Sequence, residues 1–274
     1  MEFLITNGHI ERKNETNLNH LLTDTEFRLS QKAWYGYGGI PFFYENLAQI
    51  KEQAEALALP FPKEFKDEHE LFRLTKRMLN KNKLYRSGYV HFQLFWKEKQ
   101  VQTLITANAF PEFDFPFSET GVLVTFSSLS KNSKSAFNRF PFFNETLWQA
   151  GLSEIHQNPF QQVIFLNEND WVCESLHSNI FLIKENELIT PALASGCYFD
   201  VLRPHILKAA KQAGLNISEP TNFDKTKTLD ADEIFVASES VGIQWVLGIE
   251  NKRFLHDGSK EIYNLLINSL QPNS

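Results

Sequence analysis

The chain has 274 residues, of which 42% are hydrophobic and 22% are charged, which is typical of a globular protein with one large or two modest domains. Its formal net charge of −6 argues against nucleic acid as the main partner, because phosphate binding needs a basic face. No apolar run reaches the ~18 residues that a membrane span needs, and the polar N-terminus lacks a signal-peptide pattern. We therefore expect a cytoplasmic protein without a membrane segment.

Cysteine and histidine spacing gives no sign of a metal site or a disulfide framework. Cys173 and Cys197 are the only cysteines, which favours a reducing compartment. None of the eight histidines is placed for a zinc motif such as HExxH, so no metal is expected.

The N-terminal part is predicted to mix strands and helices. "MEFLIT" followed by "NG" is typical of a short strand that ends in a tight turn, and "YGYGGIP" is typical of a second turn. Apolar spacing predicts helices over 44–59 and 62–83, and then strands over 88–97 and 100–108.

A proline-rich and acidic segment, 109–120, has no helical period and predicts a crossing between two domains. We therefore expect an N-terminal α/β domain over 1–113 and a C-terminal α/β domain over 114–274. In the second domain, "SSLSKNSKSAFNR" at 127–139 is predicted to be a polar loop. The expected strands are 121–126, 161–167, 178–190, 233–238 and 242–250, and the expected helices are 143–157, 203–215 and 260–270.

The segment from Cys173 to Pro220 carries the most informative pattern. It holds Glu174, "SNIF" at 178–181, "TP" at 190–191 and then Arg203 at the start of a helix. This order resembles the signature of class IV aminotransferases, the fold-type IV group of pyridoxal phosphate enzymes. The late "DADEIFVASESVGIQWV" and the early "GGIPFFYENL" match the same family.

The resemblance implies a two-domain α/β fold like that of D-amino-acid aminotransferase, assembled as a homodimer. It also implies an aminotransferase or aminodeoxychorismate lyase activity that depends on pyridoxal phosphate. Such an enzyme needs a lysine for the Schiff base, a carboxylate at the pyridine nitrogen, and a cup of N–H groups, hydroxyls and a cation for the phosphate. Glu174 stands at the carboxylate position, and Asn179 belongs to the same pocket rim.

The phosphate cup departs from the family pattern at several positions. The family loop resembles "GiLxGitR", whereas this chain has "GCYFDVLR", with Asp200 in place of the second glycine and Val201 and Leu202 after it. Glu239 stands at the late strand's hydroxyl position, and Ser240 follows it. Gln49 replaces the helix arginine that reaches the phosphate. Because two carboxylates near a phosphate repel it, pyridoxal phosphate is expected to bind poorly. Asp200 is also well placed to cap the next helix.

The Schiff-base lysine is missing from its expected place. In the family it lies a little more than thirty residues before the glutamate and three or four residues before an asparagine. Asn144 is 30 residues before Glu174, so the lysine position falls on Pro141. Proline has no primary amine for a Schiff base, and it suits the first turn of a helix. The nearest lysines are Lys131 and Lys134; Lys134 precedes an asparagine by four, but both are better explained as a solvated loop.

Three functions remain open at this point. The first is a degenerate family member that binds no cofactor and keeps a binding role. The second is an active aminotransferase or 4-amino-4-deoxychorismate lyase that holds pyridoxal phosphate through Lys134. The third is a cofactor-independent enzyme or binding protein that reuses the cleft for a small molecule, with His91, Gln93 and Tyr35 as candidate pocket residues.

Overall fold

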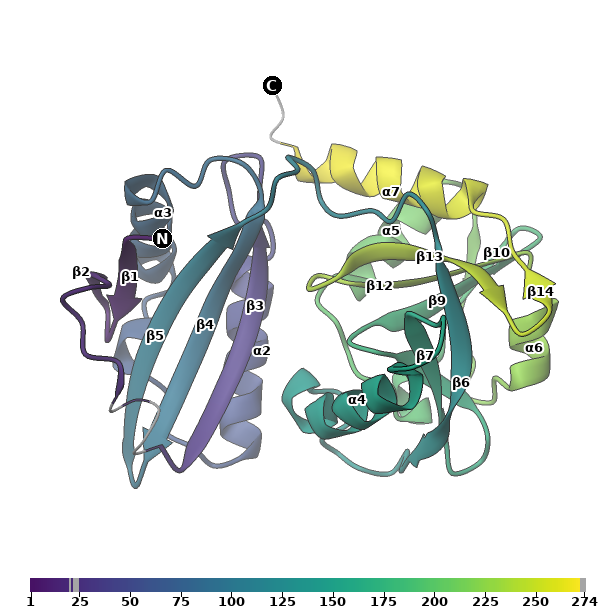
Figure 1. Cartoon of the computed structure of the whole chain (residues 1–274), viewed down its shortest axis with the longest axis horizontal. Coiled ribbons are helices and arrows are strands. Elements are labelled where there is room, and N and C mark those ends of the chain that lie inside the picture. The colour runs from purple at the N-terminus through teal and green to yellow at the C-terminus, as the bar shows by residue number, and fades with distance from the viewer. Residues whose placement is uncertain (20, 22–24, 272–274) are drawn as a thin grey trace. The chain divides into compact units, whose positions relative to one another are not determined.

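The computed structural model describes residues 1–19, 21 and 25–271 (Figure 1). The chain is divided into two compact units. The boundary lies between Phe115 and Pro116, two residues beyond the expected boundary at 113. Among the described residues, no helix is both long and apolar enough to cross a membrane.

Unit 1, residues 1–115, is a five-stranded antiparallel sheet in the order β2-β1-β5-β4-β3, with two long helices. Its elements are β1 (Phe3–Thr6), β2 (His9–Arg12), β3 (Phe27–Tyr35), α2 (Phe43–Ala56), η1 (Lys63–Phe65), α3 (Glu68–Lys81), β4 (Gly88–Lys97) and β5 (Gln100–Ala109).

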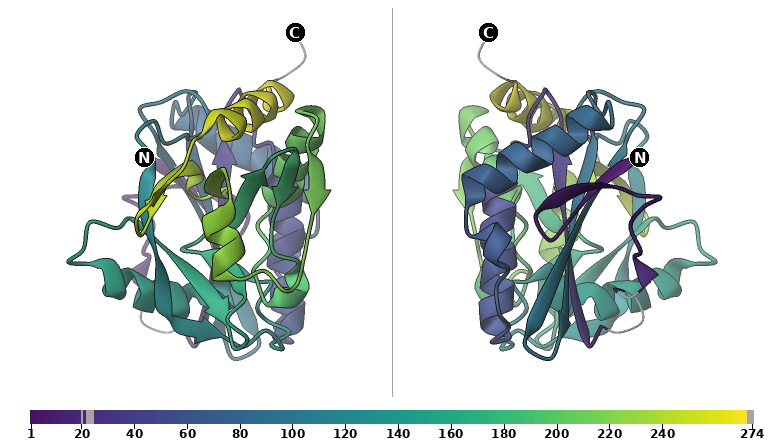
Figure 2. Two further views of the ribbon diagram at one scale, coloured as in Figure 1. Left: turned by 90° about the vertical axis from the view of Figure 1, so that its right-hand side faces the viewer. Right: turned by 90° about the vertical axis from the view of Figure 1, so that its left-hand side faces the viewer.

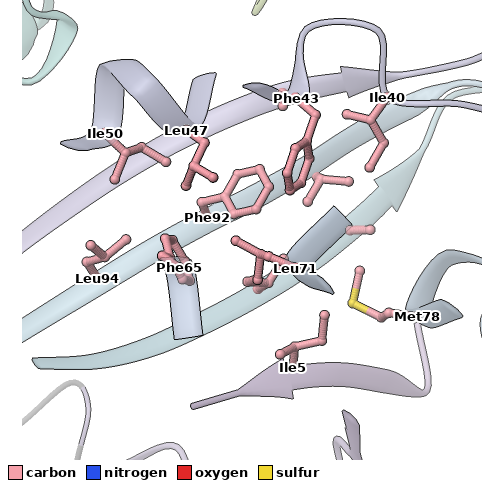
Figure 3. Close-up of a cluster of buried hydrophobic side chains, with 14 of the residues drawn as sticks. Ile5, Ile40, Phe43, Leu47, Ile50, Phe65, Leu71, Met78, Phe92 and Leu94 are labelled. Carbon is pink, nitrogen blue, oxygen red and sulfur yellow. The ribbon is translucent and has the colours of Figure 1, made fainter. Parts of the chain in front are cut away.

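Apolar side chains from one face of this sheet and from α2 form the core of unit 1. Figure 3 shows Phe43 and Leu47 of α2 above Phe92 of β4. The long strand β3 was not predicted, although its alternating residues carry the signal. The second expected helix begins only at Glu68, because the carboxylate of Asp67 accepts the N–H of Glu70 and caps the helix there.

Unit 2 begins at Pro116 and is built on a mixed sheet in the order β11-β10-β9-β12-β13-β6-β7-β8, with β14 paired to β13. Helices α5 and α7 lie side by side (Figures 1 and 2). The elements are β6 (Val122–Lys131), α4 (Pro141–Ile155), β7 (Gln162–Asn167), β8 (Val172–Ser175), β9 (Asn179–Lys184), β10 (Glu187–Ile189), η2 (Leu193–Ser195), α5 (Arg203–Gln212), β11 (Asn216–Ser218), α6 (Lys225–Asp230), β12 (Glu233–Ser238), β13 (Gly242–Ile249), β14 (Lys252–Arg253) and α7 (Asp257–Leu270).

The strand β6 is longer than expected, and its extension matters for the site. The loop prediction for 127–131 is wrong, because β6 continues to Lys131. Its pairing with β7 shifts register between Phe126 and Ser130, and it then resumes with Ser130 opposite Leu166 and Lys131 opposite Asn167. Ser127 and Lys131 are buried, whereas Ser128 and Ser130 are exposed. Ser127 and Lys131 therefore lie on the inward side of this extension.

Candidate functional site

Glu174 lies in β8 at the centre of the candidate site and is 0% exposed. Its Oε2 accepts hydrogen bonds from Lys131 Nζ at 2.6 Å and from the backbone N–H of Tyr198 at 2.7 Å. Its Oε1 accepts from Trp148 Nε1 at 2.8 Å. Three donors from β6, α4 and the loop before α5 therefore converge on one buried carboxylate.

The sheet explains how Lys131 reaches Glu174. β6 and β7 are parallel, and β8 returns antiparallel to β7 with Phe165 opposite Glu174. Strand β7 therefore lies between β6, which carries Lys131, and β8, which carries Glu174. The two side chains are 2% and 0% exposed, so each charge is balanced by the other away from solvent.

Asp200, in the loop that leads into α5, is a second buried carboxylate that accepts several hydrogen bonds. Its Oδ1 accepts the backbone N–H groups of Leu202 and Glu239, both at 2.9 Å, and its Oδ2 accepts the hydroxyl of Tyr198 at 2.8 Å. Burial raises the pKa of Asp200 to about 6, against the opposing effect of these hydrogen bonds. Burial and the Asp200 charge raise the pKa of Tyr198 well above its usual range.

The prediction that Asp200 caps the next helix is wrong, because no side chain of the described residues caps the start of α5. Helix α5 begins at Arg203, and its N-cap is Leu202. The Asp200 carboxylate does bond the N–H of Leu202, but it also bonds Glu239, beyond the end of β12. Its bonds therefore join two segments of unit 2 and do not cap the helix.

Of the remaining cup positions, Asn179 bonds this loop directly. Asn179 of β9 donates from Nδ2 to the carbonyl of Tyr198 at 2.7 Å and accepts the N–H of Asp200 at 3.2 Å. Val201 and Leu202 are buried apolar residues. The hydroxyl of Ser240 lies 3.1 Å from the hydroxyl of Ser238.

Neither Pro141 nor Lys134 contributes an amine to Glu174. Pro141 is the first residue of α4, where its fixed φ suits a helix start. The side chain of Lys134 is exposed, and its backbone N–H bonds Asn132 Oδ1 at 3.0 Å. The lysine whose side chain meets Glu174 is Lys131 instead.

The candidate residues of unit 1 fall into separate places. Gln49 of α2 is buried, and its Oε1 accepts from Gln31 Nε2 at 2.7 Å. His91 and Gln93 share one face of β4, where burial and the nearby cations lower the pKa of His91 to about 4. Tyr35 lies in the core on the opposite face, because side chains alternate along a strand, so it does not join the other two.

Sequence reasoning missed Trp148 and Tyr198 as site residues. Both are 2% exposed, and their rings meet edge to face with centroids 5.0 Å apart. Trp148 lies one helical turn after the buried Asn144, a spacing that could have placed it on the inward face of α4. No comparable pattern in the sequence points to Tyr198.

A family profile decides the affiliation of the chain. The profile of the amino-transferase class IV family matches residues 33–249. The chain belongs to the amino-transferase class IV family. A probable branched-chain-amino-acid aminotransferase of Thermotoga maritima is 32% identical over 110 residues, which are 40% of this chain and 40% of that protein. An aminodeoxychorismate lyase of Vibrio harveyi is 30% identical over 103 residues, 36% of this chain and 38% of the relative.

Solved structures of other proteins have the same fold as this chain. A branched-chain amino acid aminotransferase from Thermobaculum terrenum in its PLP form aligns with a TM-score of 0.84 and 17% identity, over 98% of this chain and 94% of that one. A putative 4-amino-4-deoxychorismate lyase from Legionella pneumophila aligns with a TM-score of 0.74 and 19% identity, over 91% and 94%. At these identities the likeness concerns the fold, and the expected fold-type IV architecture is confirmed.

The side chains expected to hold pyridoxal phosphate, the cofactor of the family, make bonds within the chain. Glu174, which is expected at the ring nitrogen, holds Lys131 and two further donors. The N–H groups expected to cradle a phosphate already bind Asp200. Arg203, the cation retained from the family pattern, pairs with Glu219 Oε2 at 2.7 Å and bonds Thr190 Oγ1 at 2.9 Å.

Proposed function

We propose that this chain is a class IV aminotransferase homologue that has lost Schiff-base chemistry with pyridoxal phosphate and acts by binding a small molecule or a protein. The observation that carries the proposal is the direct ion pair between Lys131 and Glu174. In a working site, the carboxylate faces the cofactor ring and the amine forms a Schiff base at the far side of that ring. Here the Lys131 amine contacts the Glu174 carboxylate directly. Pro141, which has no primary amine, stands at the position expected for the family's lysine.

A second candidate function is favoured by the burial of the same lysine. Lys131 is a buried amine in contact with the retained glutamate, so it is better placed than Lys134 to replace the lost lysine. In this alternative the chain is an aminotransferase or aminodeoxychorismate lyase, as its relatives are named, with the amine supplied from β6. Lys131 would have to leave Glu174 to serve in this way.

Spectroscopy with added pyridoxal phosphate separates the two candidates. For the degenerate protein we expect no Schiff-base band near ~410–420 nm and no change in Tm with excess cofactor. Borohydride reduction followed by peptide mapping should find no specific adduct on Lys131 or Lys134. Lys131→Arg and Lys134→Arg variants control for random labelling of exposed lysines. A saturable band with the label on Lys131 would establish the second candidate, and a label on Lys134 would establish activity through that residue.

The homodimer expected from the resemblance is also part of the proposal. Sedimentation equilibrium should give twice the 31.7 kDa mass of the chain. A monomer at micromolar concentration would contradict this assignment without affecting the absence of Schiff-base chemistry.

A further inference from the structure

The polar groups of the unit 2 site are bound to one another. We propose that Lys131, Tyr198 and Asp200 have taken over the polar contacts that the family gives to its cofactor, so that the groups that would hold the cofactor are satisfied without it. This inference rests on the proposed function and adds a mechanism for it. It concerns how the site is filled, whereas the proposed function concerns which chemistry is absent.

Lys131 fills the end of the site where the cofactor ring would meet Glu174. The ammonium lies 2.6 Å from Oε2, and the two side chains are 2% and 0% exposed. A buried carboxylate without a cation or donors is strongly unfavourable, because burial removes its hydration. Lys131 therefore supplies from within the chain the positive charge that a protonated ring nitrogen would otherwise bring.

Asp200 fills the end where the phosphate would lie. The N–H groups of Leu202 and Glu239 come from segments far apart in the sequence, and both point at Oδ1 from 2.9 Å. Convergent backbone N–H groups of this kind bind anions. Because Asp200 is a covalently attached anion, an incoming phosphate would have to displace it and would be repelled by its charge.

Tyr198 connects the two ends. Its backbone N–H bonds Glu174 Oε2 at 2.7 Å, and its hydroxyl bonds Asp200 Oδ2 at 2.8 Å. The residue thus bonds one carboxylate through its backbone and the other through its hydroxyl, and its ring packs against Trp148. One residue of the chain therefore links the two acids.

Freeing the N–H groups of Leu202 and Glu239 tests the inference. Asp200→Gly removes the internal anion, and Asp200→Asn removes the charge but keeps an acceptor oxygen at the same place. With inorganic phosphate as the probe, we expect roughly tenfold tighter binding to Asp200→Gly than to the wild type, measured as a phosphate-dependent rise in Tm. Asp200→Asn should resemble the wild type. Glu233→Gln is a matched control, because Glu233 also accepts two backbone N–H groups, at 2.8 and 3.0 Å.

A measurement on the wild-type protein keeps the inference testable if the glycine variant does not fold. The amide proton shifts of Leu202 and Glu239 should titrate together with a midpoint near pH 6, the pKa to which burial raises Asp200. Independent titration of the two amides would overturn the inference, as would equal phosphate binding by the wild type and Asp200→Gly. These outcomes leave the proposed function standing. A reducible Schiff base in the wild type would instead remove the proposed function itself.

Discussion

At Glu174, three hydrogen-bond donors meet one carboxylate that is 0% exposed. A carboxylate with this burial is tolerable only while its cation is present, because the charge has no access to water. Lys131 is therefore expected to be a stabilising residue in the absence of cofactor. This distinguishes it from a catalytic lysine, which must be released to react.

Replacing Lys131 by methionine should destabilise the protein strongly. The variant keeps a side chain of similar length but leaves Glu174 without its counter-charge, and breaking such a buried pair costs ~3–5 kcal/mol. The free energy of unfolding from urea titration measures the loss. Lys131→Met with Glu174→Gln should recover most of it, because the buried charge is then also gone.

An exposed ion pair in the same unit provides the control for this prediction. Lys260 lies 3.5 Å from Glu119, with side chains 38% and 80% exposed. Lys260→Met should change the free energy of unfolding by less than ~1 kcal/mol, because exposed pairs contribute little. A loss at Lys131 no larger than the loss at Lys260 would contradict a stabilising role for the buried pair.

At the scale of elements, Asn144 lies at the start of α4, at the position proposed for the family's asparagine. Asn144 is 3% exposed and donates from Nδ2 to the carbonyls of Asn138 at 2.7 Å and Phe140 at 2.8 Å. These bonds tie the loop that follows β6 to the first turn of α4. They give Asn144 a structural reason to remain that does not depend on a cofactor.

Asn144→Ala should lower the free energy of unfolding by ~1–3 kcal/mol, since two carbonyls near the helix start lose their donor. The matched control is Asn158, just beyond the other end of α4, whose Nδ2 donates to the Glu154 carbonyl at 3.1 Å in an exposed setting. Its alanine variant should stay within ~0.5 kcal/mol of the wild type. Chemical denaturation of both variants makes the comparison, and equal effects would count against the proposed tie.

The element β6 also shows where sequence reasoning succeeded and where it failed. The family positions proposed for Glu174 and Asp200 rest on local motifs that lie within one stretch of chain, and they stay predictions. The partner of Glu174 did not, because a polar run rich in serine and lysine has low strand propensity and became a strand only through pairing with β7. The Asp200 bond to the Glu239 N–H joins residues 39 apart in the sequence, and no local pattern reports such a contact.

At the scale of the whole molecule, the charged groups give opposite pH dependences of stability. Hydrogen bonds from Ser133 lower the pKa of Glu168, and a hydrogen bond from the Glu185 N–H together with Lys184 lowers the pKa of Asp232. Carboxylates of this kind add stability above their ordinary pKa and lose it as the pH falls. Asp200 acts in the other direction, because burial raises its pKa from 3.8 to about 6.

The sign of the Asp200 effect follows from proton linkage. Between these two pKa values the folded protein holds the Asp200 proton more tightly than the unfolded chain does. Its contribution to the free energy of unfolding is therefore full below pH 3.8 and is lost as the pH rises through about 6. A shift of this size corresponds to at most ~3 kcal/mol. The hydroxyl of Tyr198 and the N–H groups of Leu202 and Glu239 face the carboxylate, and Tyr198 does not titrate in this range because its own pKa is raised.

A comparison of the wild type with Asp200→Asn isolates this contribution from the other carboxylates, which titrate equally in both proteins. Between about pH 4 and pH 6.5, the free energy of unfolding of the wild type should fall relative to the variant. Above that range the difference between them should be constant. Urea titrations at a series of pH values measure it. Parallel curves for wild type and Asp200→Asn would mean that Asp200 keeps its ordinary pKa and does not bridge the two segments as a buried anion.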